Sequence, residues 1–335
     1  MNYGTTKIIL LAATLLTSFS LFALNCSVCQ KNIRSRYLKN DKNKVFCSQK
    51  CFAKTVSKCA KCRKPCLNGS YIFFKKHYCS KKCLEAVSRC KNCDQPSMKI
   101  RVIVNQDGKS MMLCPQCVNL PKCYFCNLPY RTRQLPDSRH ICKDCSKTAV
   151  SSHDEIRKRV RFIRQKLKSL FGFDNTHHIE LEILPLDRLE QQSSQLYRGE
   201  GQQRLAMMRY SYEISERTDF RGKKSKSLKR QKCKILILDN VPADLLDDAL
   251  AHELAHDYLR HNAGNVKDLK LEEGFAETIA AAFNNAMQKK HLNKRKENNP
   301  DPVYGGGYRA ISKLMKTKGF RSTVQFIKAH AAPVM

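Results

Sequence analysis

The sequence predicts an α+β chain, in which an array of small four-cysteine modules precedes a mainly helical domain with a few strands. Cysteine usage is the first reason, because 17 of the 18 cysteines lie between Cys26 and Cys145 and only Cys233 lies beyond them. The second reason is that, after about residue 148, apolar residues recur at helical and strand spacings. With 335 residues, the chain is long enough for two or three domains and a sizeable core.

The start of the chain has the pattern of an export signal. Lys7 is the only charged residue among the first 30, and an apolar run from Ile8 to Leu16 follows it. Ala23 and other small residues offer a cleavage site. We therefore expect residues 1–24 to be a signal peptide that directs the protein to the periplasm or out of the cell. If the segment is not cleaved, it would instead anchor the chain in a membrane.

The chain is strongly basic, with 62 Lys+Arg against 29 Asp+Glu and a formal charge of +33. Such an excess favours acidic partners, which include acidic proteins, anionic membrane surfaces and nucleic acid. The basic residues are spread along the chain, so a solvated basic surface is the alternative interpretation. We expect protein partners; nucleic acid is less favoured but not excluded.

The cysteines form four repeats, each opened by a pair with two residues between them. The repeats start 33, 31 and 33 residues apart, and a second cysteine pair closes each one. Four thiolates per repeat are what one tetrahedral zinc ion requires, and metal binding would supply folding free energy that such short units lack. We expect about four structural zinc ions, in modules 1 and 2 (residues 26–86) and modules 3 and 4 (residues 87–148). The predicted ligands are Cys26, Cys29, Cys47, Cys51, Cys59, Cys62, Cys79, Cys83, Cys90, Cys93, Cys114, Cys117, Cys123, Cys126, Cys142 and Cys145.

Disulfides are the competing interpretation, because export would place these cysteines in an oxidising compartment. Against them, two cysteines separated by two residues would close a very short, strained ring, whereas successive pairs of pairs are typical of zinc modules. Two cysteines fall outside the repeats: Cys66 could be an alternative ligand, and Cys233 is expected to be a buried thiol. His77 and His140 precede closing pairs and are expected to be bystanders. Each module should consist of a short hairpin and a short helix.

The second half begins with a predicted helix, from the capping-box pair Ser152 and Glu155 to about Leu170. The alternation from His178 to Leu184 predicts a strand. Residues 191–232 are polar, and we expect a loop or mobile insertion there. A short strand should follow at residues 234–238, and Pro242 is placed to begin the next helix, which Gly264 should end.

That helix, at about residues 243–260, carries the motif His252-Glu253-Leu254-Ala255-His256. His252 and His256 are four residues apart, so they share one helix face and can bind one zinc ion. Glu253 lies beside His252, where it could accept a proton from a zinc-activated water that attacks a peptide carbonyl. The motif therefore predicts a catalytic Zn²⁺ in addition to the structural ions.

A second helix, beginning near Leu271, supplies the expected third ligand. Three protein ligands and a water would form an open catalytic site, and Glu273 is the predicted third ligand. Glu277 lies one turn further on, where it could hold a ligand histidine by its free ring nitrogen. Glu272 is expected to face elsewhere. The alternative is that these glutamates are only surface charge on a helix.

Three separated motifs carry a resemblance to a known family. The Glu273-Gly274-Phe275-Ala276 piece is similar to the third-ligand motif of zinc aminopeptidases of the Glu-zincin group. Taken with the zinc motif upstream and the segment Pro302 to Ala310, residues 150–335 resemble the peptidase domain of the DA-one family of LIM-domain zinc metallopeptidases. The resemblance implies a zincin-like peptidase fold behind LIM-like zinc modules. The modules here are LIM-like rather than LIM, because seven residues separate Cys51 from Cys59 and all the ligands are cysteines.

The C-terminal motif contains Gly305-Gly306-Gly307 between two tyrosines. Tyr304, Tyr308 or Arg309 could donate a hydrogen bond to the oxyanion that forms when water attacks a carbonyl, and we name Tyr304 and Tyr308 as candidate catalytic residues. The alternative is a glycine turn that only packs against the catalytic helices.

Three functions are compatible with these patterns. The favoured one is a zinc-dependent peptidase that hydrolyses protein substrates and uses its N-terminal modules to dock a substrate or partner. The second is a non-catalytic zinc-module protein with a basic surface for protein or nucleic acid. The third is an oxidised cysteine array acting in redox chemistry or adhesion. The intact set of His252, Glu253, His256 and Glu273 favours the first, because a scaffold would not need all four.

Overall fold

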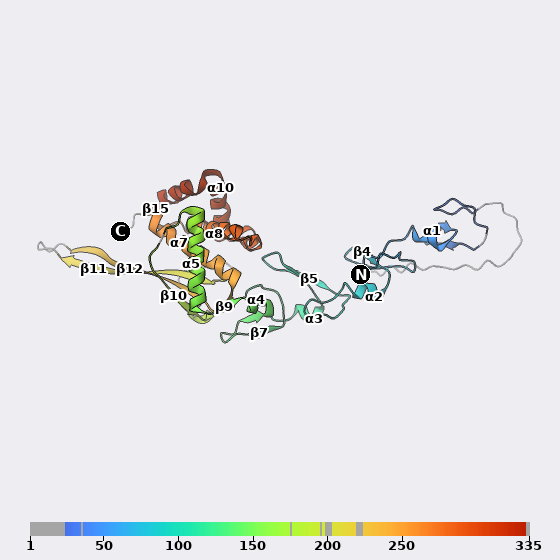
Figure 1. The fold of residues 1–335 in the computed structure, drawn as a ribbon, viewed down its shortest axis with the longest axis horizontal. Coiled ribbons are helices and arrows are strands. Elements are labelled where there is room, and N and C mark those ends of the chain that lie inside the picture. The colour runs from blue at the N-terminus through green and yellow to red at the C-terminus, as the bar shows by residue number, and fades with distance from the viewer. Residues whose placement is uncertain are drawn as a thin grey trace. The chain divides into compact units, whose positions relative to one another are not determined.

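The computed structural model describes residues 24–34, 36–174, 176–194, 196–197, 203–218 and 224–332. The predicted export signal therefore lies outside the described residues, except for Leu24. The structure is α+β and divides into two compact units (Figure 1). The first unit contains the chain up to Val102 together with Met112–Val118. The second unit contains Ile103–Met111 together with the chain from Asn119 onward. Among the described residues, no helix is long and apolar enough to cross a membrane.

Each of the four cysteine modules consists of a two-stranded antiparallel hairpin followed by one short helix, as predicted. Ser48 and Ser80 are the N-caps of the first two helices, and each hydroxyl accepts a hydrogen bond from the backbone N–H of the closing cysteine three residues later. The elements are β1 (Leu38–Lys39), β2 (Val45–Phe46), α1 (Gln49–Ala53), β3 (Tyr71–Phe73), β4 (Lys76–Tyr78), α2 (Lys81–Glu85), β5 (Arg101–Val104), β6 (Ser110–Leu113), α3 (Pro115–Val118), β7 (Thr132–Gln134), β8 (His140–Cys142) and α4 (Lys143–Lys147).

The fourth module belongs to the core of the second unit. Phe125 and Ile141 are each 1% exposed and join the same hydrophobic cluster as the helices that follow. Arg139 is paired with Asp137 in a buried salt bridge of 2.7 Å, and its guanidinium also donates to the backbone carbonyl of Asp239. The boundary between the two compact units thus falls within the third module, and the fourth module buries its apolar residues in the core of the second unit.

A three-stranded mixed sheet lies at the centre of the second unit, in the order β10-β12-β11. β10 (Ile179–Leu184) runs parallel to β12 (Lys224–Leu238), and β11 (Ala206–Thr218) pairs antiparallel with β12. β10 confirms the predicted strand. The remaining short elements are β9 (Ala149–Val150), α6 (Leu186–Gln192), β13 (Val241–Pro242), β14 (Asn265–Val266), η1 (Lys290–Leu292), α9 (Asn293–Glu297) and β15 (Ala331–Ala332).

The prediction of a loop or mobile insertion over residues 191–232 was wrong for residues 206–218 and 224–232. β11 and the first part of β12 form a long antiparallel ribbon there. Strands in a ribbon satisfy their backbone hydrogen bonds by pairing with each other, so they can continue without an apolar face. The two strands keep one antiparallel register along the ribbon, apart from a shift between Glu213 and Ile214.

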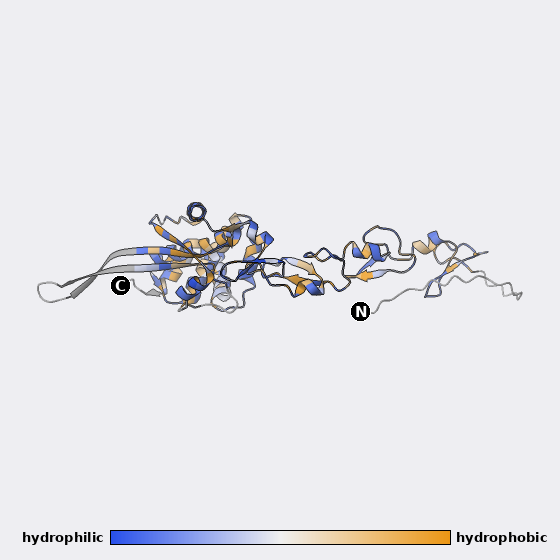
Figure 2. Cartoon of the chain, turned by 90° about the horizontal axis from the view of Figure 1, so that it is seen from below, coloured by the Kyte–Doolittle hydropathy of each residue, from blue (hydrophilic) through white to orange (hydrophobic). Residues whose placement is uncertain are grey.

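The long helices are α5 (His153–Phe171), α7 (Ala243–Ala263), α8 (Leu269–Ala286) and α10 (Tyr304–Ala329) (Figure 1). Helices α5 and α7 pack against the sheet, and α8 and α10 pack against α7 and each other. Hydrophobic and hydrophilic residues are interspersed along the elements of the chain (Figure 2). Ser152 is the N-cap of α5, as expected, but its side chain makes no capping hydrogen bond and Glu155 pairs with Arg159 instead. Gly264, with a φ of 87°, ends α7 where the sequence predicted.

The glycine-rich segment begins α10 and does not form a turn. A Cβ atom added at Gly274 would lie 2.5 Å from the backbone carbon of Gly307, and one added at Gly307 would lie 2.4 Å from the carbonyl oxygen of Lys270. Helices α8 and α10 therefore cross in direct backbone contact, which only glycine permits. Gly306, on the next face, has ordinary space, with its nearest neighbours at 3.7 Å.

This crossing predicts different outcomes for neighbouring glycine-to-alanine changes. Gly274→Ala should lower the free energy of unfolding by about 1–3 kcal/mol, because the new methyl group forces two helices apart. Gly306→Ala is the matched control and should be neutral or stabilising by up to about 1 kcal/mol, because alanine favours a helix and has room. Chemical denaturation of the full chain measures both. Equal effects of the two changes would contradict the proposed backbone contact.

Candidate functional site

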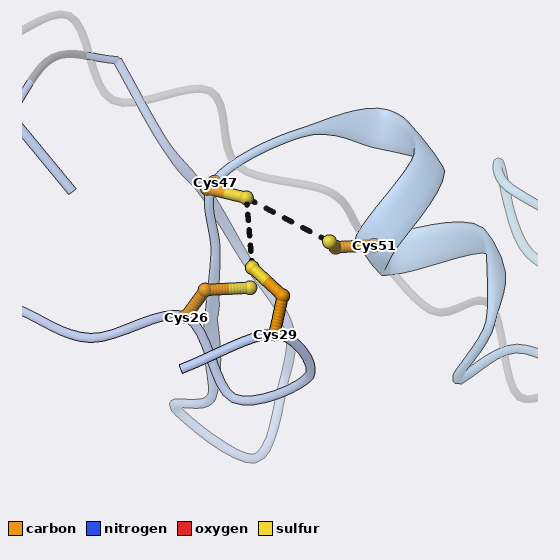
Figure 3. A group of neighbouring side chains, drawn as sticks. All are labelled: Cys26, Cys29, Cys47 and Cys51. Carbon is orange, nitrogen blue, oxygen red and sulfur yellow. Dashed lines mark hydrogen bonds between the residues drawn. The ribbon is translucent and has the colours of Figure 1, made fainter. Parts of the chain in front are cut away.

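Each module brings its four cysteines together in a cluster that could bind a metal ion, with all four sulfur atoms within 4.8 Å of one another. Figure 3 shows the first cluster, in which Cys26 and Cys29 come from a loop, Cys47 follows β2 and Cys51 lies on α1. Its hydrogen-bonded sulfur pairs are 3.5 and 3.6 Å apart. A tetrahedral ZnS₄ site has sulfur separations of roughly 3.8 Å, whereas bonded sulfurs lie at about 2.05 Å. The clusters therefore fit structural zinc.

Backbone hydrogen bonds favour the thiolate form of the opening cysteines. The backbone around Cys29 is the largest cause that lowers the pKa of Cys26, to about 6. Burial raises the pKa of Cys59, but backbone hydrogen bonds from Cys62 and Cys79 outweigh it and lower the value to about 6. Since zinc binds thiolates, these N–H groups favour metal binding.

The histidines near the clusters are bystanders, as expected. His77 hydrogen-bonds the Ser70 hydroxyl at 2.7 Å, and His140 hydrogen-bonds the Thr132 hydroxyl at 2.9 Å. Cys66 is 4% exposed and is not among the four cysteines of its module's cluster.

In the second unit, the residues of the predicted catalytic site line one cavity of about 350 Å³. His252, Glu253 and His256 reach it from α7, Glu272, Glu273 and Glu277 reach it from α8, and Tyr304 reaches it from the start of α10. Met207 and Met208 of β11 form part of the opposite wall. The cavity thus lies between the two predicted helices and the free edge of the sheet.

The three predicted ligand atoms converge. His252 Nε2 and His256 Nε2 are 3.0 Å apart, and Glu273 Oε2 lies 3.2 Å from the first and 3.5 Å from the second. Tetrahedral zinc with bonds of about 2.0–2.1 Å requires ligand separations of roughly 3.3 Å. Glu273 Oε2 is buried and makes no hydrogen bond of acceptable geometry among the described residues. A buried, otherwise unsatisfied carboxylate oxygen beside two imidazole nitrogens fits a metal ligand set.

Charge coupling in this cluster is strong. Burial raises the pKa of Glu273, but His256 and His252 outweigh burial and hold it well below its usual range. Burial lowers the pKa values of His252 and His256, yet the neighbouring carboxylates raise both overall. The negative charge on this wall therefore attracts a cation, whether that cation is a proton or a metal.

Glu253 points toward the sheet edge. It is 8% exposed, and its Oε2 accepts a 2.7 Å hydrogen bond from the backbone N–H of Met208. This bond holds the carboxylate on the cavity wall beside His252 without making it part of the converging triad.

The ring nitrogens that face away from the triad have carboxylate neighbours. Glu277 Oε1 lies 3.8 Å from His252 Nδ1. The expectation that Glu272 faces elsewhere was wrong, because its Oε1 lies 3.5 Å from His256 Nδ1. Residue spacing along one helix does not reveal such a contact, because it depends on how α8 packs against α7.

Lys296 is a site residue that sequence reasoning missed. It is 7% exposed, its ammonium contacts Glu277, and it lies 3.1 Å from a carboxylate oxygen of Asp248. Burial lowers its pKa, but these two carboxylates raise it overall. Nothing in the basic run Lys294-Arg295-Lys296 indicates that Lys296 is buried. Its partners lie on α7 and α8, far away in sequence.

The two candidate tyrosines are placed differently. Tyr304 lines the cavity, and burial together with the charge of Glu273 raises its pKa. Tyr308 is not among the residues that line the cavity, and Arg309 donates to the backbone carbonyls of Glu297 and Asn299. Position therefore favours Tyr304 over Tyr308 and Arg309 for contact with a bound molecule.

No protein-family model matches the chain, and no curated protein matches it either.

The stability of the second unit should depend on the fourth cysteine module and not on the first. Cys126→Ser in the fourth module should accelerate amide exchange in α5 at least about tenfold, because that module shares the core of this unit. Cys29→Ser in the first module is the matched control and should leave α5 unchanged. Hydrogen-exchange mass spectrometry measures both. An equal change in α5 for both variants would show that the fourth module has no special structural role.

Removal of the buried ammonium should be costly. Lys296→Met should lower the free energy of unfolding by about 3–5 kcal/mol, because the partly buried carboxylates of Asp248 and Glu277 would lose their cation. Lys294→Met, two residues away on the exposed side of α9, is the control and should change stability by no more than about 0.5 kcal/mol. Denaturant titration of both variants checks this, and a loss in Lys296→Met no larger than in the control would contradict the assigned ion pairs.

Proposed function

We propose that the protein is a zinc-dependent metallopeptidase of the HExxH type, with a zincin-like domain from about residue 150 onward. The observation that carries the proposal is the convergence of His252, His256 and Glu273 on one point, with Glu253 on the wall of the same cavity. The resemblance to the DA-one family, drawn from three motifs of the sequence, supports the same assignment.

When bound to His252, His256 and Glu273, the zinc ion would act as a Lewis acid toward water and a peptide carbonyl. Glu253 would accept the proton of the attacking water and later deliver it to the leaving amine. The Met208 N–H that binds one carboxylate oxygen of Glu253 leaves the other free to face the reacting water. Tyr304 would donate its phenolic hydrogen to the developing oxyanion, since its raised pKa keeps it protonated at neutral pH.

Glu277 would fix the ring of His252 through Nδ1, and Lys296 would hold Glu277 in turn. Carboxylate partners of this kind orient a ligand histidine and increase its basicity. Glu272 would do the same for His256. The chain thus has a partner for each predicted histidine ligand.

For the cysteine modules, we propose a role in docking a protein substrate or partner. The second module exposes Ile72 (63%) and Phe74 (57%) at its hairpin, beside Lys75 and Lys76. Apolar side chains next to basic ones suit a partner surface that is apolar and acidic. A non-catalytic binding protein is the alternative, and it would use the same surface without the metal triad.

We also propose that the protein is exported, to the periplasm or beyond, because of the pattern in residues 1–24. A membrane-anchored form would follow if this segment is not cleaved. Zinc in the cysteine clusters would protect their thiols from oxidation in such a compartment.

The assigned mechanism predicts the behaviour of Glu253→Gln. This variant should lose peptidase activity by a factor of about 10²–10⁴, because the amide cannot accept the proton of the attacking water. Its zinc content should stay the same, because Glu253 is not in the triad. Hydrolysis of an unfolded protein substrate, followed by mass spectrometry, measures the activity.

Glu297→Gln, an exposed change on α9, is the matched control and should keep full activity. Full activity of Glu253→Gln would refute the assigned base. If the purified wild-type chain holds no zinc at His252, His256 and Glu273 and takes none up, the metallopeptidase assignment fails and the binding alternative gains support.

A further inference from the structure

A second group of potential metal ligands lies in the second unit and has no part in the proposed reaction. His177, Cys233 and Asp257 each offer one ligand atom, and the three atoms lie within 4.8 Å of one another. The sequence predicted only a buried thiol at Cys233, and His177 was not among its candidate site residues. The tertiary structure brings both to the helix that carries the predicted catalytic motif.

Three separate elements build this cluster. Cys233 lies in the central strand β12, opposite Tyr210 of β11 and Ile179 of β10. His177 lies two residues before Ile179, at the entrance to β10. Asp257 lies on α7, four residues after Glu253, so both carboxylates share a helix face that is directed toward the sheet.

Two of the three groups lie in the protein interior. Asp257 is 1% exposed and Cys233 is 4% exposed. His177 Nε2 lies 3.0 Å from Asp257 Oδ1, which is close to the separation of roughly 3.3 Å between two ligands of one zinc ion. A contraction of at most about 1.5 Å would bring all three atoms to zinc-ligand separations.

The surroundings support the cluster. Arg164 donates to the backbone carbonyl of His177 at 3.0 Å, which fixes the backbone that carries this ligand. His261 Nδ1 lies 2.8 Å from the backbone carbonyl of Asp257, and its ring stacks on His177 with 4.4 Å between centroids. The hydroxyl of Tyr210 is buried with no hydrogen-bond partner among the described residues. A water on a metal ion would provide one.

We propose that His177, Cys233 and Asp257 bind a second zinc ion in this unit, distinct from the one proposed in the cavity. A thiolate, an imidazole and a carboxylate are all ligands that zinc accepts, and together they would leave a net charge near zero. The side chain of His177 is 29% exposed, which gives the metal a route of entry. The ion would join α7, β12 and the start of β10, and so brace the helix that carries His252 and His256 against the sheet.

The test is zinc per chain, measured by elemental analysis on the full-length protein after dialysis. Cys233→Ser should hold about one zinc ion fewer than wild type. Cys66→Ser is the matched control, because Cys66 is also 4% exposed and lies outside every four-cysteine cluster. It should keep the wild-type count. Equal zinc counts in Cys233→Ser and wild type would overturn the proposal.

Two further variants show whether a loss of zinc in Cys233→Ser reflects misfolding or a loss of zinc from the cavity site. His177→Gln changes a partly exposed residue and should also lose about one zinc ion, with an unchanged circular dichroism spectrum. In a His252→Ala/His256→Ala background, which removes the cavity ligands, Cys233→Ser should still remove one further ion. No further loss in that background would overturn the second site, whereas an unchanged count in His252→Ala/His256→Ala itself would instead contradict the proposed catalytic metal.

Discussion

The direct backbone contact between Gly274 and Gly307 is the constraint on which the candidate site depends. Glu273 immediately precedes one of these glycines, and Tyr304 lies three residues before the other. Because α8 and α10 touch without intervening side chains, the carboxylate and the phenol reach the same cavity as the histidines of α7. The separations of 3.0–3.5 Å among the three ligand atoms would not survive a shift of α8 by the width of a methyl group.

Most of the carboxylates that line the cavity have a hydrogen-bond or ion-pair partner. Glu253 accepts a backbone N–H, and Asp248 and Glu277 share the ammonium of Lys296. Glu273 differs, because one of its oxygens is buried without a hydrogen bond among the described residues. An unsatisfied anionic oxygen is costly in a protein interior unless a cation binds there. The position between this oxygen and the two imidazole nitrogens is therefore the one in the site that most favours a bound cation.

The four cysteine modules are alike in sequence but not in their packing. The first two have small clusters of their own, around Phe46 in one and Leu84 in the other. The fourth places Phe125 and Ile141 in the core of the second unit. Units this small bury little apolar surface, so the first modules would depend on a bound metal ion more than the fourth would. The same cysteine spacing is thus found in modules with a hydrophobic cluster of their own and in a module that is part of a larger core.

The sequence by itself determined what depends on spacing within one element. Paired cysteines predicted four clusters, the four-residue separation of His252 and His256 predicted a shared helix face, and Gly264 predicted a helix end. Only the tertiary structure decided which distant residues meet: Lys296 with Glu277, Glu272 with His256, and His177 with Asp257. It also decided that a polar stretch forms the β11–β12 ribbon. The physical reason is that local backbone geometry repeats with a known period, whereas contacts between elements depend on how their side chains pack and on partners far away in the chain.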